Sequence, residues 1–150
     1  MRVQIYIYQS PSFGRVKHGK AIWLIQVMTI KGPATKYGIV KADDISARRL
    51  FLMTLKEALD KLNKRCQIEL YTTDRFFVSV IYRGLLSRWS KNGYKSARGA
   101  DIKNKDLWEE VNKLSNLHTI RIIEAHDHEY MSWMVTQLKG GKVIWTTMRR

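Results

Sequence analysis

The order of apolar and polar residues at the start of the chain predicts three β-strands. Val3–Tyr8 has the alternating pattern of a strand, and Ala21–Ile30 and Ala34–Val40 are rich in β-prone residues. We expect these strands to form an antiparallel meander, with Gly32 at the tight connection between the second and the third. Ser10–Gly19 holds a proline and two glycines, which predicts a loop between the first two strands.

The pattern then changes to the spacing of an amphipathic helix over roughly residues 45–63. Its apolar positions recur every three or four residues, at Ala47, Phe51, Leu55, Ala58 and Leu62. Asp43, Asp44 and Ser46 precede them, and such side chains accept hydrogen bonds from the first free N–H groups of a helix. We therefore expect the helix to start at this polar cluster.

The rest of the chain alternates predicted strands and helices. The strands are Cys66–Tyr71 and Thr119–Ile123. The helical segments run from a cap at Thr72-Thr73-Asp74 to about Leu86, over Arg88–Asn92, from Asn104 to about Leu117, and from Asp127 or His128 to about Leu138. No linker divides these elements, which predicts one domain.

The chain is strongly basic, with 27 Lys and Arg residues against 13 Asp and Glu residues and a net charge of +14. Residues 1–42 carry seven cations and no acid, and residues 83–105 carry seven cations and one acid, Asp101. A charge of this size favours a polyanionic partner, usually nucleic acid. The alternative is a basic protein whose charge serves solubility.

Cys66 is the single cysteine, which excludes a disulfide framework and a thiolate metal site. That usage is typical of a reducing cytoplasm. No apolar run reaches the length that crosses a membrane, and polar residues interrupt the N-terminal stretch where a signal peptide would need apolar ones. We expect a cytoplasmic protein without membrane contact.

Residues 88–105, which we call the basic protrusion, alternate cations with aromatic residues. The most specific motifs are Thr72-Thr73-Asp74 after a strand, Trp89, Gly93-Tyr94-Lys95, and Asn104-x-Asp106-Leu107-Trp108. In these motifs and in the order of its elements, the chain resembles the type 1 ribonuclease H family over residues 1–139. The resemblance implies an α/β fold, in which a mixed five-stranded sheet (a three-strand antiparallel meander plus two parallel strands) is flanked by helices. Residues 140–150 remain as an apolar and basic C-terminal tail.

The resemblance also implies a nuclease site in which two Mg²⁺ ions, about 3.5–4 Å apart, are held by four acids. Asp74 matches the acid at the end of the fourth strand. The other three positions fall at Tyr8 on the first strand, at Arg48 (or Arg49) on the first helix, and near Val135 on the last helix.

A shift of the alignment does not restore the three acids. The chain has no acid before Asp43, between Asp44 and Glu57, or after Glu129. We therefore interpret the chain as a divergent family member with a degenerate active site. It needs no cofactor in this interpretation, and Mg²⁺ or Mn²⁺ only if it is active.

Arg48 would repel a metal ion, but a guanidinium can hold a phosphate oxygen through a two-pronged hydrogen bond. Our hypothesis is that metal-dependent cleavage has been replaced by metal-independent phosphate binding. The alternative is that Arg48 and Arg49 form a solvated helix face.

Asp74 also has two interpretations. It is the one family carboxylate retained, and it is placed to cap a helix, a contribution of about 1 kcal/mol. A partial metal site around Asp74 would need Asp44, Asp127 and Glu129 to converge on it from loops, in a geometry that the fold holds in place.

The protrusion supplies the predicted nucleic-acid surface. The cations that could follow a backbone are Arg88, Lys91, Lys95, Arg98, Lys103 and Lys105. Trp89 and Tyr94 could stack on sugars or bases, or could pack the protrusion against the body. By resemblance, Asn104 contacts the backbone of a hybrid; it could also simply cap a helix. Asp43 falls near a position where the family has a hydroxyl that binds phosphate, and a carboxylate there would repel phosphate.

His126-Asp127-His128-Glu129 has the composition of a zinc site, but two histidines two positions apart lack a third and fourth ligand. By resemblance, His126 lies where a flexible histidine assists product release. The alternative is a polar loop before a helix, which we favour.

Three functions remain open. The first is a catalytically degenerate protein that binds an RNA–DNA hybrid or double-stranded RNA through its backbone and shape. The second is an active, metal-dependent ribonuclease H with relocated ligands. The third is a scaffold that binds another protein. The resemblance also suggests the setting of a mobile element.

Overall fold

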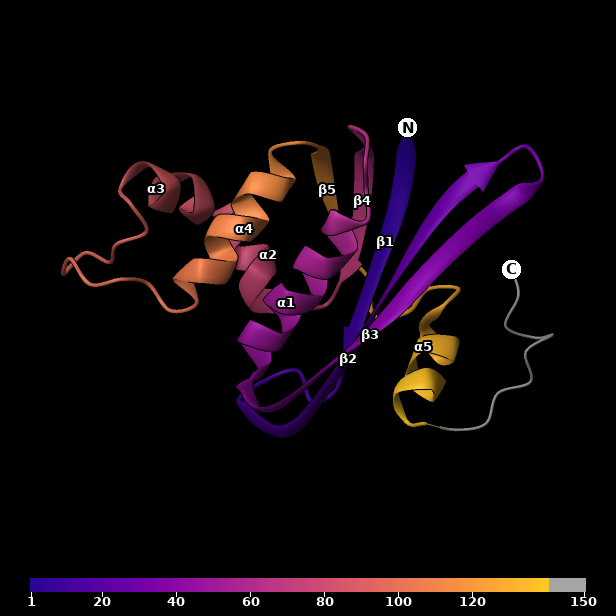
Figure 1. The fold of residues 1–150 in the computed structure, drawn as a ribbon, viewed down its shortest axis with the longest axis horizontal. Coiled ribbons are helices and arrows are strands. Elements are labelled where there is room, and N and C mark those ends of the chain that lie inside the picture. The colour runs from indigo at the N-terminus through magenta and orange to yellow at the C-terminus, as the bar shows by residue number, and fades with distance from the viewer. Residues whose placement is uncertain (141–150) are drawn as a thin grey trace.

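Five strands form one sheet, in the order β3-β2-β1-β4-β5, in the computed structural model, which describes residues 1–140 (Figure 1). The strands are β1 (Arg2–Gln9), β2 (Arg15–Thr29), β3 (Gly32–Ser46), β4 (Gln67–Thr72) and β5 (Thr119–Glu124). The central β1 pairs antiparallel with β2 and parallel with β4, and β5 continues the parallel part. The expected mixed sheet of a meander plus two parallel strands is therefore confirmed.

Helices cover both faces of this sheet. They are α1 (Ala47–Asp60), α2 (Arg75–Tyr82), α3 (Leu85–Lys91), α4 (Lys105–Ser115) and α5 (Met131–Leu138). Figure 1 shows α1 and α5 on opposite sides of the sheet, with α3 and the following loop projecting beyond α4. The parallel strands β1 and β4 both end where α1 and α2 begin, which brings their loops together at one edge.

Side-chain alternation along β1 divides the interior into two clusters. Val3, Ile5 and Ile7 belong to the larger cluster under α1, whereas Tyr6 belongs to a smaller one under α5. Alternate residues of a strand point to opposite faces, so one strand supplies both layers. The same alternation fixes which side chains reach each surface of the molecule.

The predicted loop at Ser10–Gly19 was wrong in its second half. β2 already begins at Arg15, and Arg15 pairs with Ser46 at the end of β3. The segment from Arg15 to Lys20 is polar and mostly exposed, so it carries no apolar alternation. Its strand structure comes from pairing with β3, which the local sequence does not encode.

The start of α1 was predicted too early. Asp43 and Asp44 lie in β3, and the cap is Ser46, whose Oγ accepts a hydrogen bond from the Arg49 N–H at 3.1 Å. Similarly, α5 begins at Met131, later than the predicted start at Asp127 or His128.

The two predicted helical segments, from Asp74 to about Leu86 and over Arg88–Asn92, are both present, but the break between them lies earlier than predicted. α2 ends at Tyr82, and α3 begins at Leu85 after Gly84, whose φ of 66° is left-handed. Glycine adopts this conformation without the steric cost that a side chain would add. The break redirects the chain outward into the protrusion.

The boundary between the domain and its tail stays a prediction, since the tail, apart from Gly140, lies outside the described residues. Within residues 1–140, no helix is long and apolar enough to cross a membrane.

Candidate functional site

A hollow of about 500 Å³ lies where α1 and α2 begin, beside the loop that follows β1. Charged or polar side chains come from Arg48 of α1, from Asp74 and Arg75 at the start of α2, and from His126 of the loop after β5. Phe76 adds an aromatic wall. We call this the Arg48 hollow.

Asp74 caps α2. Its Oδ1 accepts a hydrogen bond from the Phe77 N–H at 2.8 Å, and its own N–H donates to Thr72 Oγ1 at 3.0 Å. Burial raises the pKa of Asp74, and the hydrogen bonds from the backbone of α2 and the charge of Arg48 oppose that rise. The capping interpretation of Asp74 therefore has direct geometric support, and it leaves the carboxyl facing the hollow.

Arg48 stacks on an aromatic ring inside this hollow. The centre of its guanidinium lies 3.7 Å from the centroid of Phe76. A cation over a ring face is held by the quadrupole of the ring, and its edge stays free to donate hydrogen bonds. Arg48 is thus positioned by Phe76 while its side chain remains accessible.

The acids do not form a site for Mg²⁺ in this structure. Across residues 1–140, no three His, Cys, Asp or Glu side chains lie close enough to hold a metal ion. Asp44 pairs with Arg15 at 3.0 Å, and Asp127 Oδ1 accepts a hydrogen bond from the His128 N–H. The donor set at the Arg48 hollow, one carboxylate next to a cation, does not fit a hard divalent ion that needs several oxygen ligands.

Glu129, the remaining acid of the predicted partial site, lines a different hollow. That hollow also contains Tyr6, Tyr71 and His128 and lies on the α5 face of the sheet. The convergence of Asp44, Asp127 and Glu129 on Asp74 is therefore not what the structure shows.

Tyr8 and Val135, the two other positions matched to family acids, do not line the Arg48 hollow. Tyr8 is partly buried against the smaller cluster under α5, and Val135 lies on α5 itself. Neither side chain carries a carboxylate, so neither adds a ligand for a metal ion.

The base of the protrusion is joined to α1 by Arg49, which is paired with Asp106 and is therefore not part of a solvated helix face. Arg49 donates two hydrogen bonds to the Asp106 carboxylate, at 3.0 and 2.7 Å, and a third to Asn104 Oδ1 at 3.3 Å. This pairing raises the pKa of Arg49 and lowers the pKa of Asp106. Asn104 occupies the predicted N-cap position of α4, with a left-handed φ of 61°, but its side chain makes no capping hydrogen bond to the helix.

The two aromatic residues of the protrusion pack inward. The Trp89 ring meets the buried Trp108 edge to face, with centroids 5.3 Å apart. The Tyr94 hydroxyl accepts a hydrogen bond from Asn112 Nδ2 at 3.2 Å. Both side chains are partly buried against the main core, which supports the packing interpretation over stacking on bases.

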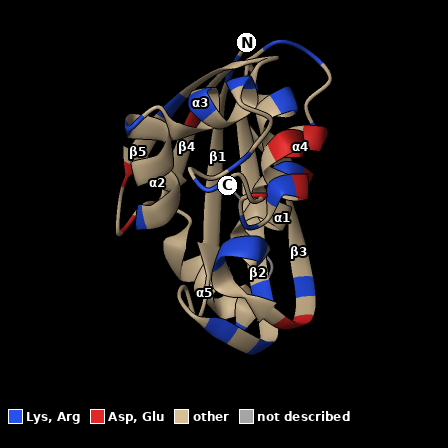
Figure 2. Ribbon diagram, turned by 90° about the vertical axis from the view of Figure 1, so that its left-hand side faces the viewer, with Lys and Arg blue, Asp and Glu red and all other residues tan. Residues whose placement is uncertain are grey.

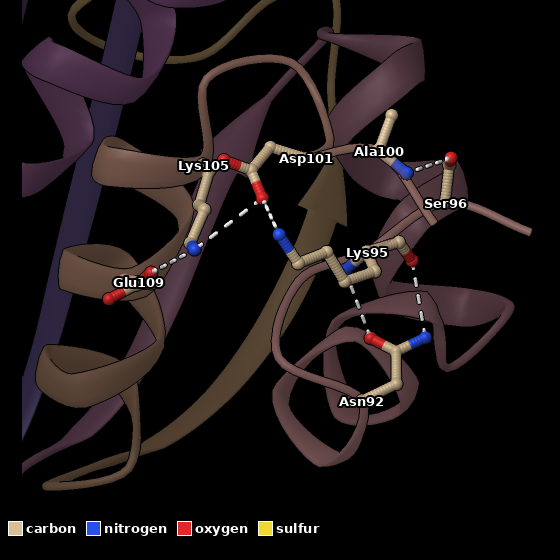
Figure 3. A network of polar contacts seen from close by, with 7 residues as sticks. All are labelled: Asn92, Lys95, Ser96, Ala100, Asp101, Lys105 and Glu109. Atoms are coloured by element: carbon tan, nitrogen blue, oxygen red, sulfur yellow. Dashed lines mark hydrogen bonds and ion pairs between the residues drawn. The ribbon is translucent and has the colours of Figure 1, made fainter. Parts of the chain in front are cut away.

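Asp101 forms ion pairs with two of the lysines that were predicted to contact phosphates. Lys95 pairs closely with Asp101, and Lys105 lies 3.6 Å from the same carboxylate oxygen and 3.8 Å from Glu109 (Figure 3). The hydrogen bond from Lys95, and then the charge of Lys105, lower the pKa of Asp101. Asn92 exchanges two hydrogen bonds with the backbone of Lys95, so the turn that presents this lysine is itself ordered.

The remaining cations of the protrusion are more open. Arg88 donates to the Arg83 carbonyl oxygen at 3.2 Å and is otherwise exposed. Lys91, Arg98 and Lys103 are exposed, and no ion pair involves them within the described chain. Figure 2 shows Lys and Arg on α3 and along the loop that leads to α4, with acids on α4.

The histidine cluster is divided between two hollows. His126 is exposed and lines the Arg48 hollow with Asp74. The His128 ring lies 4.5 Å from the Tyr6 ring, and burial lowers the pKa of His128. The cluster therefore does not act as one metal site.

Asp43, expected near a phosphate contact, lies in β3. One of its carboxylate oxygens is 3.2 Å from Nδ1 of His18.

Comparison with known proteins identifies the family. The protein-family model for RNase H matches residues 5–133. The chain belongs to the ribonuclease H family. The ribonuclease H of Acetivibrio thermocellus is 33% identical over 85 residues, covering 57% of this chain and 58% of that protein. The ribonuclease H of Chlorobium phaeobacteroides is 29% identical over 112 residues, covering 73% of this chain and 74% of that protein.

Solved structures show the same ribonuclease H fold. LC9-RNase H1, described as a type 1 RNase H with the type 2 active-site motif, has a TM-score of 0.71 at 22% identity, covering 93% of this chain and 73% of that one. A foamy viral protease-reverse transcriptase in complex with RNA/DNA hybrid has a TM-score of 0.64 at 15% identity, covering 91% of this chain and 19% of that one. The chain spans little more than half the length of the first curated relatives that it matches.

Proposed function

We propose that this ribonuclease H-family protein binds an RNA–DNA hybrid or double-stranded RNA without a divalent metal, and that the Arg48 hollow takes one backbone phosphate. The observation that carries the proposal is the Arg48 guanidinium, held over Phe76 next to the single carboxylate of Asp74. A guanidinium matches the geometry of a phosphate and needs no metal bridge. This arrangement favours retention of a nucleic acid over its cleavage.

The protrusion supports the same proposal from a second direction. Its exposed cations lie on α3 and on the loop that follows, and none of them lines the Arg48 hollow. Contacts to phosphates carry no sequence information, so binding would tolerate any sequence and would weaken steeply with salt. A net charge of +14 would speed association with a polyanion.

A second candidate function is metal-dependent cleavage of the RNA strand of a hybrid. The curated relatives are named Ribonuclease H, and Asp74 and His126 face the same hollow. In this case Mg²⁺ or Mn²⁺ would have to recruit acids that now lie elsewhere. The family alone is a weak argument for chemistry, since function belongs to the site.

The experiment is a labelled RNA–DNA hybrid incubated with the protein, with and without Mg²⁺ or Mn²⁺, and measured for both retention and cleavage. We expect retention without cleavage, and an affinity whose logarithm falls linearly with the logarithm of salt concentration. Arg48→Ala should weaken retention about tenfold, which corresponds to about 1.4 kcal/mol for one charge-assisted contact.

The control variants separate the effect of the two-pronged hydrogen bond of Arg48 from the effect of its positive charge. Arg48→Lys keeps the charge but loses the two-pronged geometry and should lie between the parent and Arg48→Ala. Lys20→Ala removes an exposed cation of β2 and should change retention little. Metal-dependent cleavage that Asp74→Asn abolishes would reverse the proposal, and neither retention nor cleavage would favour a protein partner.

A further inference from the structure

The α5 face of the sheet carries a hollow of about 490 Å³ that is separate from the Arg48 hollow. Its aromatic residues are Tyr6 of β1, Tyr71 of β4 and His128 of the loop before α5, and two amide side chains, Gln4 and Gln26, lie beside them. The volume falls within the roughly 300–1,000 Å³ of pockets that take a small ligand. We call it the tyrosine hollow.

Strand pairing places the polar and aromatic lining in two neighbouring rows. Gln4 of β1 is paired with Gln26 of β2 on one side and with Glu69 of β4 on the other. Tyr6 lies two positions further along β1, on the same face of the sheet, and is paired with Tyr71 of β4. The register of the sheet therefore sets a row of amides beside a row of rings.

Hydrogen bonds along the polar row fix the direction of each amide. The hydrogen bond from Gln4 lowers the pKa of Glu69, and an ionised carboxylate only accepts, so Gln4 presents its Nε2 to Glu69, at 3.0 Å. Gln4 Oε1 then accepts from Gln26 Nε2 at 3.2 Å, and Gln26 Oε1 accepts from the Tyr130 hydroxyl. A primary amide has two N–H donors, so each glutamine keeps one that no other described residue takes.

Two further donors belong to the aromatic residues. Tyr6 is 4% exposed, and its hydroxyl makes no hydrogen bond within residues 1–140. Burial, and then the neighbouring Tyr71, raise the pKa of Tyr6, so the phenol keeps its proton. His128 Nδ1 accepts from the Tyr130 N–H at 3.1 Å and burial lowers the pKa of His128, so the neutral ring carries its proton on Nε2. A buried donor without a protein partner is normally satisfied by water or by a ligand.

We propose that the tyrosine hollow binds an unpaired nucleobase that carries two ring carbonyl groups, as uracil does. The base lies against the partly exposed ring of Tyr71. Its carbonyl oxygens accept hydrogen bonds from the remaining amide donors of Gln4 and Gln26 and from the Tyr6 hydroxyl. Stacking on an aromatic ring tolerates any base, whereas fixed donors select a base edge that accepts.

The lining disfavours other occupants. The carboxylates of Glu69 and Glu129 would repel a phosphate, and Arg2, together with the donors, would oppose a cation. Cytosine has an amino group where uracil has a carbonyl, so it would bring a donor against a donor. The hollow shares no residue with the Arg48 hollow or the protrusion, so the inference does not rest on the proposed binding of a hybrid.

The test is a nuclear magnetic resonance titration of the isotope-labelled full chain with uridine, which follows the side-chain amide signals of Gln4 and Gln26. We expect saturable shifts with a dissociation constant of about 1 mM or tighter. Cytidine should bind about tenfold more weakly, because one carbonyl acceptor is replaced by a donor. Tyr6→Phe keeps the packed ring, loses only the hydroxyl, and should weaken uridine binding about three- to tenfold.

Tyr82→Phe is the matched control, because it removes a hydroxyl from a residue of α2 that is 68% exposed and lies outside the hollow. It should leave the affinity for uridine within about twofold of the parent. Equal affinities for uridine and cytidine in the parent chain would overturn the proposal, and so would uridine shifts that leave the amides of Gln4 and Gln26 unchanged.

Short single strands distinguish the two sources of such a base. Tetrauridylate that binds more tightly than both uridine and tetracytidylate, and shifts the same amides, would assign the hollow to an unpaired strand. Uridine that binds as tightly as tetrauridylate would assign it to a free nucleoside. Both outcomes support recognition of the base, and neither requires retention or cleavage of a hybrid.

Discussion

Asp74 connects the stability of α2 to the chemistry of the Arg48 hollow. Its carboxyl caps the helix through the Phe77 N–H, yet burial raises its pKa. The folded protein therefore holds the Asp74 proton more tightly than the unfolded chain does. A residue in this position stabilises the fold most when it is protonated, so its contribution depends on pH.

The pH dependence of Asp74 can be measured against Asp74→Asn, which keeps a capping side chain but does not titrate. Because the pKa of Asp74 is raised in the folded state, Asp74 contributes to the free energy of unfolding fully at pH values below 3.8, its pKa in the unfolded chain. This contribution is lost as pH rises through the folded-state pKa. We expect the free energy of unfolding of the parent, relative to Asp74→Asn, to fall over that window. Urea titrations at a series of acid pH values check this, and a difference that rises with pH would contradict it.

The protrusion is an element whose charges are partly compensated in the free protein. Asp101 draws Lys95 and Lys105 together, as Figure 3 shows, so fewer cations are available than the sequence counts. A phosphate that contacts either lysine would compete with this carboxylate. If the protrusion binds nucleic acid as we propose, its affinity should therefore be lower than its composition alone implies.

Asp101→Asn should release both lysines. We expect the affinity for a hybrid to rise about two- to fivefold, the scale of an exposed ion pair. The slope of log affinity against log salt should steepen by about 0.9 for each released lysine that finds a phosphate. The matched control is Asp60→Asn, which breaks the exposed pair with Lys56 on α1. An equal gain in both variants would point to net charge alone.

Elements with a regular apolar period were predictable from the sequence, and elements that depend on distant partners were not. The period of α1 and the alternation of β1 gave their positions to within two or three residues. The polar start of β2 at Arg15 exists because β3 lies beside it. The break at Gly84 could have been found, because glycine inside a helical pattern often marks its end.

The molecule as a whole is a sheet with unequal layers. The α1 face holds the larger cluster, whereas α5, a helix of eight residues, covers the other face with Met134 and Leu138 as its buried residues. Few side chains therefore hold α5 in place. Removal of one of them should have a large effect on the stability of the whole domain.

Met134→Ala should lower the free energy of unfolding by about 2–5 kcal/mol, because it deletes a fully buried side chain and leaves a cavity. Met28→Ala is the matched control, since Met28 is 65% exposed, and it should change stability by less than about 0.5 kcal/mol. Chemical denaturation measures both. Similar small losses would mean that α5 contributes little to the cooperative fold.

The candidate site was predictable in composition but not in geometry. The sequence located Asp74, Arg48 and the cations of the protrusion, because their positions follow from motifs. It did not show that Phe76 would orient Arg48 or that Arg49 would tie α1 to Asp106, since both contacts depend on packing between helices.

The edge-to-face contact of Trp89 with Trp108 also gives the junction between the protrusion and the body a spectroscopic signal. Two indoles whose centroids lie 5.3 Å apart couple their electronic transitions, and the coupling depends on their mutual angle of 66°. Trp89 belongs to α3 and Trp108 to α4. Near-ultraviolet circular dichroism of the unlabelled protein would therefore report any reorientation of the protrusion when a ligand binds.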